Sequence, residues 1–352
     1  QGMGYQVLTT HKGKRFSAAK AFLDRVRGRA NLDVLTGVRV ERVLFEGKRA
    51  SGIQLADRNI ACHGEIILSA GAVESPKLLE LSGIGDSARL KALGIEPLVY
   101  SPFVGENLRE HRYVAVDWKV KSGSSNRNLQ GFGLIASVVR YFLLSSGPMT
   151  DAAHEVGGFI KTRPELTRPD AQIGSMLVTM SIGANGAPVL DKFPGMRVLG
   201  YFTRPESRGW THITSKDPAA SPAINANHFA EEIDRRTAVD LFKWLRRLGR
   251  QPALSQWITE ETGKGAAFQT DEEIAANLLL LGGTSFHIAG TAAMGADETS
   301  VLDPQLRVRG VDGLRVCDTS IMPTLVSGNT NAPAMAIAMN AADIILSAKA
   351  NS

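Results

Sequence analysis

Residues 66–85, IILSAGAVESPKLLELSGIG, predict a strand, a turn and a helix in direct succession. The run Ile66–Leu68 is short and apolar, which is typical of a buried strand. Ser75 is a candidate N-cap, Pro76 fits the first helical position, and Gly83 fits the position just past the helix end. This stretch favours a mixed α/β fold.

The same mixed pattern extends over residues 1–100 and returns in residues 276–352. Residues 101–275 differ, because they are rich in Ser, Pro, Gly and turn signals and contain alternating strand candidates. They also hold one amphipathic helix, Glu231–Leu248, with apolar residues at helical spacing. We therefore expect an α/β (α+β overall) protein, in which an antiparallel sheet with a helix is inserted into a mixed domain.

Composition excludes several classes of function. The net charge is +5 over 352 residues, and the basic residues are scattered rather than gathered into a nucleic-acid-binding block. The tightest basic cluster, Lys243–Arg250, is expected on the solvated face of its helix. Cys62 and Cys317 lie in apolar, strand-like settings, which favours buried free thiols over a disulfide or a metal site.

The ends and the hydropathy of the chain bear on its location. No segment reaches the ~18 apolar residues of a transmembrane helix. The first residues, Gln1–Tyr5, match neither a signal peptide nor an initiator methionine, which is compatible with a start inside a longer protein. We expect a cytoplasmic location, with a membrane-peripheral or a periplasmic one left open.

Asp318 directly follows the apolar run Leu314–Cys317. A carboxylate at the carboxyl end of an α/β strand lies where ligands bind in such folds. A purely local role is equally open, because Asp318 is also suited to cap the turn that ends at Ser320.

The segment Ser327–Pro333 opens an apolar helix that is expected over Ala334–Lys349. Asn331 is a candidate N-cap, and Pro333 fits the first turn. Free N–H groups and the positive dipole end would attract negative charge, such as the charge that develops on a reduced flavin. An ordinary cap of a buried helix is the alternative.

His287 lies between Phe286 and a loop of Gly, Ala and Thr. Its ordinary pKa near ~6.5 suits a general base that accepts the proton of an alcohol, although a structural histidine is the alternative. Hydrolysis by a Ser/His/Asp triad is disfavoured, because the chain has no Gly-x-Ser-x-Gly elbow and Ser285 is adjacent to His287. No Gly-x-Gly-x-x-Gly follows a strand, since Gly83-Ile84-Gly85 comes after a helix.

Together these residues resemble the glucose–methanol–choline (GMC) flavoprotein oxidoreductases, in particular the bacterial choline dehydrogenase-like alcohol dehydrogenases. The similar segments are residues 71–85, 105–111, 287–295, 318–323 and 328–333. Two positions depart from the family pattern: Glu110 stands where Asp is usual, and Ile288 where Pro is usual. The resemblance covers essentially the whole chain and is weakest from residue 112 to 225.

The resemblance implies FAD-dependent oxidation of a primary alcohol, choline-like or another small or aliphatic one, to the aldehyde. His287 would be the catalytic base with Asn329 as its partner, while hydride passes to flavin N5. Glu155 would be an acidic substrate position. The implied cofactor contacts are Val38, Ala70, Gly71, Phe286, Asp318, Thr330, Asn331 and Ala332. No metal and no nucleic acid are implied, and oxygen, a quinone or a cytochrome remains open as the electron acceptor.

The resemblance also implies the domain roles. Residues 1–100 would form part of the FAD-binding domain, residues 101–275 the substrate-binding domain, and residues 276–352 the rest of the FAD-binding domain with the active-site loops. The N-terminal Rossmann βαβ unit of the family, with its glycine-rich turn, is missing from this chain, so we expect poor folding and poor FAD binding without a separate N-terminal fragment. Two alternatives are a hydroxynitrile lyase-type member with a structural FAD, and a catalytically incompetent fragment or interaction remnant.

Overall fold

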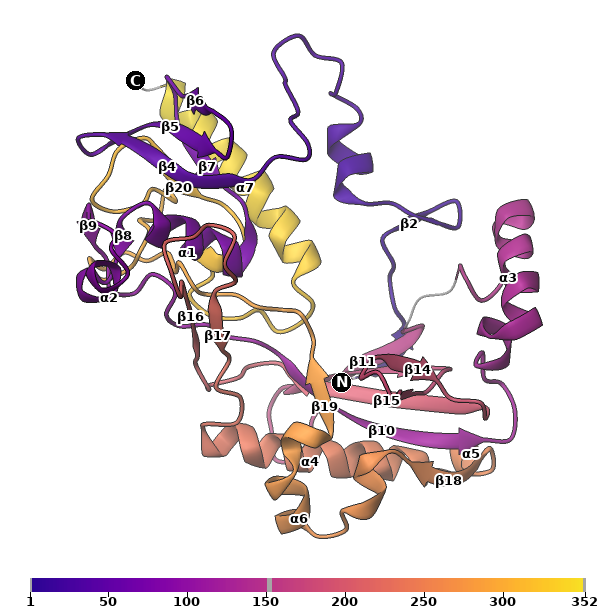
Figure 1. The fold of residues 1–352 in the computed structure, drawn as a ribbon. Helices are drawn as coiled ribbons and strands as arrows, with labels where there is room; N and C mark the ends of the chain where they lie inside the picture. The colour runs from indigo at the N-terminus through magenta and orange to yellow at the C-terminus, as the bar shows by residue number, and fades with distance from the viewer. Residues whose placement is uncertain (1, 151–153, 351–352) are drawn as a thin grey trace. The chain divides into compact units, whose positions relative to one another are not determined.

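The computed structural model describes residues 2–150 and 154–350, and the chain forms two compact units (Figure 1). Each unit is built from three separate segments. Unit 1 comprises Gln1–Asp33, Arg112–Thr203 and Glu232–Ser285. Unit 2 comprises Val34–His111, Arg204–Glu231 and Phe286–Ser352. The chain therefore crosses between the units several times.

Unit 1 is organised around a seven-stranded antiparallel sheet of order β1-β11-β12-β15-β10-β18, with β19 also paired to β10. Its strands are β1 Gly2–Tyr5, β10 Arg112–Val120, β11 Val156–Ile160, β12 Ala171–Met176, β15 Gly195–Phe202, β18 Ile258–Thr262 and β19 Gly282–Thr284. In β10 every second side chain, from Val114 to Val120, is buried, as expected for a sheet with one face packed. The predicted antiparallel sheet is confirmed.

Helix α4 (Glu232–Gly249) lies along this sheet, beside β10 and β15 (Figure 1). Leu241, Phe242 and Leu245 are fully buried on its apolar face. The prediction that its basic cluster is solvated is wrong for Arg246, which is buried and pairs with Glu261 at 2.8 Å. Burial of this guanidinium is tolerated because Glu261 and two backbone carbonyls accept its N–H groups.

The remaining elements of unit 1 are short, apart from helix α3. They are β2 Thr10–His11, β3 Lys14–Arg15, η1 Ala19–Leu23, η2 Arg127–Leu129, α3 Gly131–Leu144, β13 Met180–Ile182, β14 Pro188–Leu190, α5 Pro252–Ser255, η3 Lys264–Ala267, α6 Asp271–Ala276 and η4 Leu278–Leu280.

Unit 2 contains a parallel strand pair, β7 (Ile66–Leu68) and β20 (Leu314–Val316), with Ile66 opposite Leu314. Its other elements are β4 Val40–Glu46, β5 Arg49–Leu55, β6 Asn59–Ala61, α1 Gly71–Leu81, β8 Ile84–Gly85, α2 Ser87–Ala92, β9 Val99–Tyr100, β16 Trp210–His212, β17 Ala223–Asn225, η5 Thr319–Ile321 and α7 Asn331–Ala350. The core of unit 2 forms between the parallel pair and α1 and includes the fully buried Leu79, Leu314 and Val316. Mixed α/β structure is thus confirmed.

Helix α1 begins at Gly71, so the prediction that Ser75 caps it is wrong. The Ser75 hydroxyl instead donates to Asp318 Oδ2 at 2.5 Å and accepts the Ala70 N–H at 3.1 Å. Pro76 lies inside the helix rather than at its first position. Gly83 has φ +85° just past the helix end, which confirms the predicted terminating glycine.

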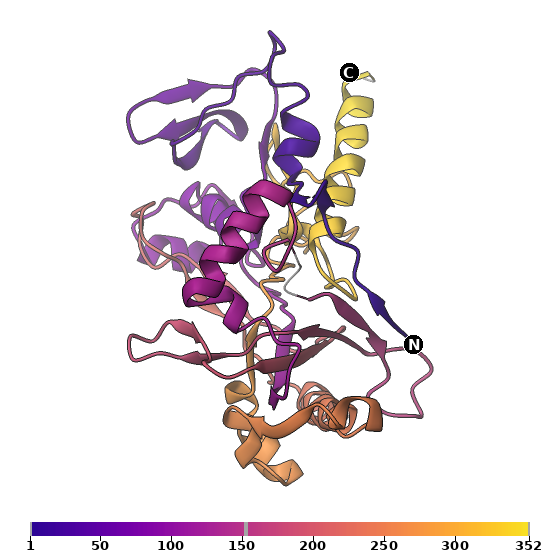
Figure 2. The ribbon, with the colours of Figure 1, turned by 90° about the vertical axis from the view of Figure 1, so that its right-hand side faces the viewer.

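Helix α7 begins at Asn331, and the Ala334 N–H bonds to Thr330 O at 2.9 Å. The helix-entry residue is therefore Thr330, and the prediction of Asn331 is one position late. Pro333 lies in the first turn, as predicted. The helix runs to the C-terminal end of the described chain (Figure 2), and Met339 and Leu346 on it are exposed. Among the described residues, no helix has the length and apolar character needed to cross a membrane.

Candidate active site

The loop that carries His287 lies between two other segments of unit 2. On one side, Ala289 and Arg109 exchange two backbone hydrogen bonds of 3.0 Å. On the other side, Ala292 N donates to Ser320 O at 2.9 Å. Gly290 has φ +91°, and a side chain there would lie 2.6 Å from Asn107 O, so only glycine fits this close approach. The backbone of the loop is therefore held on both sides.

His287 itself is buried, and both of its ring nitrogens have partners. Nε2 lies 3.1 Å from Nδ2 of Asn329, although 42 residues separate the two in the chain. Nδ1 lies 3.0 Å from Nδ1 of His111, and the two rings meet edge to face at 88°. The His287 backbone N–H donates to Glu110 Oε1 at 2.8 Å. The structure thus brings together the two residues that the sequence nominated as a catalytic pair.

Burial lowers the pKa of His287 from 6.5 to about 4. Desolvation has this direction because it disfavours the charged imidazolium. His287 is therefore neutral near pH 7 and offers one nitrogen lone pair, which a proton acceptor requires.

Asp318 lies at the carboxyl end of β20 and makes both local and distant contacts. Oδ1 accepts the Ser320 N–H at 2.8 Å, which is the local cap that was one of the two expectations. Oδ2 accepts the Gly71 N–H at 2.9 Å as well as the Ser75 hydroxyl. Asp318 thereby connects the start of α1 to the end of β20, while its contact with a cofactor stays a prediction.

The entry of α7 directly follows Asn329 in the chain. Thr330 is buried, whereas Asn329, Asn331 and Ala332 are exposed. The first N–H groups of a helix have no partner within the helix, and they carry the positive end of its dipole. The arrangement places donors for an anionic group one residue beyond Asn329.

The residues assigned to FAD by resemblance fit a large, partly aromatic ligand. Ala70 is exposed, and a Cβ built on Gly71 meets nothing within 4 Å, so space is open above the start of α1. Val38 and Phe286 are exposed to 43% and 84%, which offers apolar surface to an aromatic ring system. In the described part of the chain, no group of three His, Cys, Asp or Glu side chains is arranged to hold a metal ion.

Glu155, the predicted substrate position, belongs to unit 1, whereas His287 and Asn329 belong to unit 2. It is half-buried and directly precedes β11, and its backbone carbonyl accepts the Gln6 N–H at 2.8 Å. Its contact with a substrate stays a prediction.

Sequence reasoning assigned no role to Glu110 or His111, although both belong to the segment 105–111 that resembles a family motif. The structure places them against His287, where His111 is fully buried and Glu110 is 5% exposed. The available signal was that motif, since the resemblance covers Glu110 and His111.

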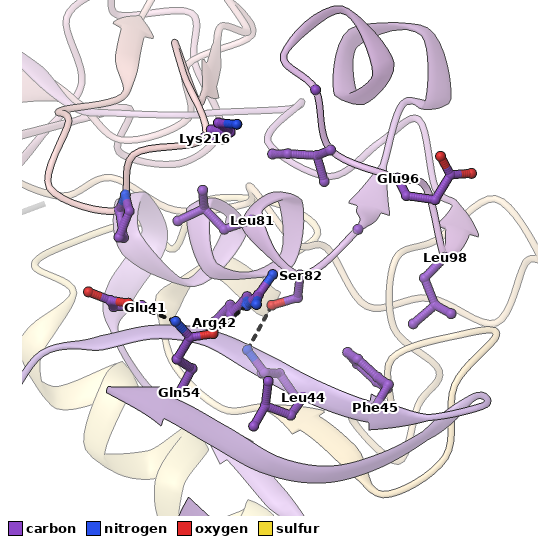
Figure 3. A pocket seen from close by; sticks show the side chains of 15 residues that line it. Glu41, Arg42, Leu44, Phe45, Gln54, Leu81, Ser82, Glu96, Leu98 and Lys216 are labelled. Carbon is purple, nitrogen blue, oxygen red and sulfur yellow. Dashed lines mark hydrogen bonds between the residues drawn. The ribbon is translucent and has the colours of Figure 1, made fainter. Parts of the chain in front are cut away.

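A separate pocket of about 510 Å³ in unit 2 lies between β4 and the C-terminal end of α1 (Figure 3). Val43 N donates to Ser82 Oγ at 2.9 Å in its wall, and Arg42 and Lys216 are among its lining residues. Helix α1 has 11 residues, so its two ends are about 16 Å apart. Asp318 contacts the start of α1, and none of the predicted site residues lines this pocket.

Comparison with known proteins identifies the family. The GMC oxidoreductase models match residues 1–113 and 205–338. The chain belongs to the GMC oxidoreductase family, and the resemblance inferred from the motifs is confirmed.

Two curated relatives are bacterial. An alcohol dehydrogenase [acceptor] from Pseudomonas putida is 35% identical over 98% of this chain and 64% of its own length. An oxygen-dependent choline dehydrogenase from Burkholderia ambifaria is 36% identical over 96% of this chain and 60% of its own length. The chain thus spans somewhat less than two thirds of these relatives.

Solved structures agree with the fold. Pyridoxine 4-oxidase from Mesorbium loti superposes with a TM-score of 0.83 at 27% identity, over 97% of this chain and 64% of that one. Formate oxidase from Aspergillus oryzae, which carries FAD, superposes with a TM-score of 0.88 at 26% identity, over 97% of this chain and 65% of that one. The predicted fold class is confirmed, and the expected cofactor agrees with the one named for this structural relative.

Proposed function

We propose that this chain is the part of an FAD-dependent alcohol oxidoreductase that carries the active-site base. The reaction proposed for this oxidoreductase is the oxidation of a primary alcohol to the aldehyde. The observation that carries the proposal is the contact between the buried His287 and Asn329, with Nε2 and Nδ2 3.1 Å apart, where Asn329 directly precedes the entry of α7. Membership of the GMC family supports the same reaction class.

In the proposed reaction, the alcohol hydroxyl binds where Nε2 of His287 and the amide of Asn329 meet. Nε2 accepts the hydroxyl proton, and the Asn329 N–H donates to the oxygen as negative charge develops on it. FAD, when bound, supplies the acceptor for the hydride that leaves the carbon. The N–H groups that open α7 would stabilise negative charge at the reacting centre.

The low pKa of His287, about 4, has two consequences for this role. The imidazole is neutral at pH 7, so one of its nitrogens is unprotonated and can accept a proton. Negative charge on the bound reactants would also raise the pKa towards the working pH, because an opposite charge stabilises the imidazolium. Proton acceptance is thereby favoured when the alkoxide forms.

The substrate and the acceptor form the finer part of the proposal. A choline-like or a small aliphatic alcohol is supported by relatives named choline dehydrogenase and alcohol dehydrogenase. Glu155 would face a cationic substrate group. Oxygen is the first candidate acceptor, since one relative is named oxygen-dependent, with a quinone or a cytochrome as the others. We further propose a cytoplasmic location and the substrate-binding role for residues 101–275.

The test adds FAD and an N-terminal polypeptide with the glycine-rich turn to three forms of the chain: wild type, His287→Ala, and His63→Ala, which removes an exposed histidine as a control. We expect His287→Ala to abolish turnover with the flavin spectrum retained, and His63→Ala to act like wild type. An alcohol added anaerobically should bleach the flavin. Near-normal turnover in His287→Ala, or product release without bleaching, would contradict the proposal, and the latter result would favour a lyase.

A further inference from the structure

His111 is a buried group to which the proposed reaction gives no task. Its side chain is fully buried, and its Nδ1 lies 3.0 Å from Nδ1 of His287. The segment that carries it is held to the His287 loop by the two Arg109–Ala289 hydrogen bonds. The contact between the two rings is therefore supported by backbone on both sides.

The two contacts of His287 together determine where its proton resides. In the orientation that the structure gives to the Asn329 amide, its nitrogen faces Nε2 of His287, and because an amide nitrogen is a donor only, Nε2 accepts and carries no proton. A neutral imidazole then has its proton on Nδ1, and this proton is the one shared with His111. His111 Nδ1 accordingly accepts.

We propose that His111 is a positioning residue, which accepts the Nδ1 hydrogen bond of His287 and so keeps Nε2 unprotonated. Its catalytic consequence rests on the proposed function, whereas the tautomer itself does not. The second nitrogen of a catalytic imidazole commonly sets the tautomer in this way. Here the partner is a neutral ring rather than a carboxylate.

The neutral partner has an electrostatic consequence. When His287 gains a proton at Nε2, its Nδ1–H continues to donate to His111, and the hydrogen bond becomes charge-assisted. Two titratable groups contact His287: His111 at the ring and Glu110 at the backbone N–H, while Asn329 on the other side of the ring is uncharged. Protonation of His111 would oppose the reaction, because its Nδ1 could no longer accept and its charge would repel the imidazolium.

The first test reads the tautomer without any need for activity. Protein labelled with ¹⁵N-histidine is examined by NMR near pH 7, and the His287 signals are assigned by their loss in His287→Gln. We expect a neutral ring protonated at Nδ1. In His111→Leu we expect the proton to shift towards Nε2, while His63→Asn leaves the His287 signals unchanged. A ring protonated at Nε2 in wild type, or unchanged signals in His111→Leu, would overturn the proposal.

The second test uses FAD-loaded protein and the conservative variant His111→Asn, whose amide oxygen can stand in for Nδ1 as an acceptor. We expect kcat to fall roughly 10- to 100-fold in His111→Leu, the effect of one hydrogen bond to a charged group, with KM little changed. His111→Asn should restore most of kcat. Equal losses in both variants would show a merely structural role and would overturn the proposal.

If His111→Leu does not fold, the NMR measurement on His111→Asn still tests the proposal. In that variant the His287 signals must remain those of a ring protonated at Nδ1. Loss of all turnover in His287→Ala bears on the proposed function alone. The two proposals can therefore fail separately.

Discussion

Thr291 donates its hydroxyl to the carbonyl of Ala72 at 2.6 Å, across 219 residues of sequence. Ala72 O is the helical acceptor that Pro76, four residues later in α1, cannot use because proline has no N–H. The loop that carries His287 thus satisfies a carbonyl that the helix itself leaves open. The proline in α1 and the threonine in the His287 loop are therefore linked, because the threonine supplies the hydrogen bond that the proline cannot make.

Replacing Thr291 with Val should lower the free energy of unfolding by about 1–3 kcal/mol, because a buried carbonyl loses its donor. Urea denaturation measures the change, with Thr324→Val, at an exposed position, as the control. In a Pro76→Ala background the restored N–H supplies a donor, so the cost of Thr291→Val should shrink. Additive costs in the double variant would contradict the proposed coupling.

Asp318→Asn should destabilise the protein by about 1–3 kcal/mol, since an amide cannot accept the Gly71, Ser75 and Ser320 hydrogen bonds as well as a carboxylate does. Thermal and urea unfolding report the loss. Asp312→Asn, at an exposed position, is the matched control. Equal stability of the two variants would show that Asp318 does not stabilise the contact between α1 and β20.

Stability should depend on pH through His287. Its pKa is 6.5 when unfolded and about 4 when folded, so the unfolded state binds more protons between these values. Stability should therefore fall as pH drops from about 6.5 to about 4, and this contribution should be lost below that range. In His287→Gln the slope across this window should be shallower, whereas His63→Gln should retain the wild-type slope. An unchanged slope in His287→Gln would contradict the assigned pKa.

Gly83→Ala should destabilise unit 2 by about 1–3 kcal/mol, because an alanine is strained at positive φ. Gly83 has φ +85°, and the added Cβ would lie 2.8 Å from Glu96 O. Gly64→Ala is the control, since a Cβ there meets nothing within 4 Å. Urea unfolding of the two variants should differ clearly, and equal midpoints would count against the strain argument.

FAD should bind this chain weakly, with a Kd above roughly 1 μM, because no glycine-rich turn is present to hold its pyrophosphate. Gly83-Ile84-Gly85 does not replace that turn, since it follows α1 and continues into β8. Flavin fluorescence titration measures the affinity, and adding an N-terminal polypeptide with the turn should tighten it. Stoichiometric FAD in the purified chain with alcohol turnover would refute the expectation.

The sequence alone predicted the helices and strands that depend on residues close together in the chain. The strand Ile66–Leu68, the helix-ending Gly83 and the amphipathic helix α4 all follow from periodicity and backbone preference. The start of α1 could not be predicted, because Ser75 was expected as a local cap and instead bonds to Asp318, 243 residues away. The burial of Arg246 was missed for the same reason, since its partner Glu261 lies outside the helix, on β18.

The sequence alone nominated His287 and Asn329 and, through five separate motifs, the family. Only the tertiary structure showed that His111 contacts His287, because the two residues are 176 positions apart and local sequence patterns do not report such distant contacts. Composition and spacing report what each segment prefers by itself. The tautomer, burial and pKa of a histidine depend on the groups that the fold packs around it, and these come from three distant parts of the chain.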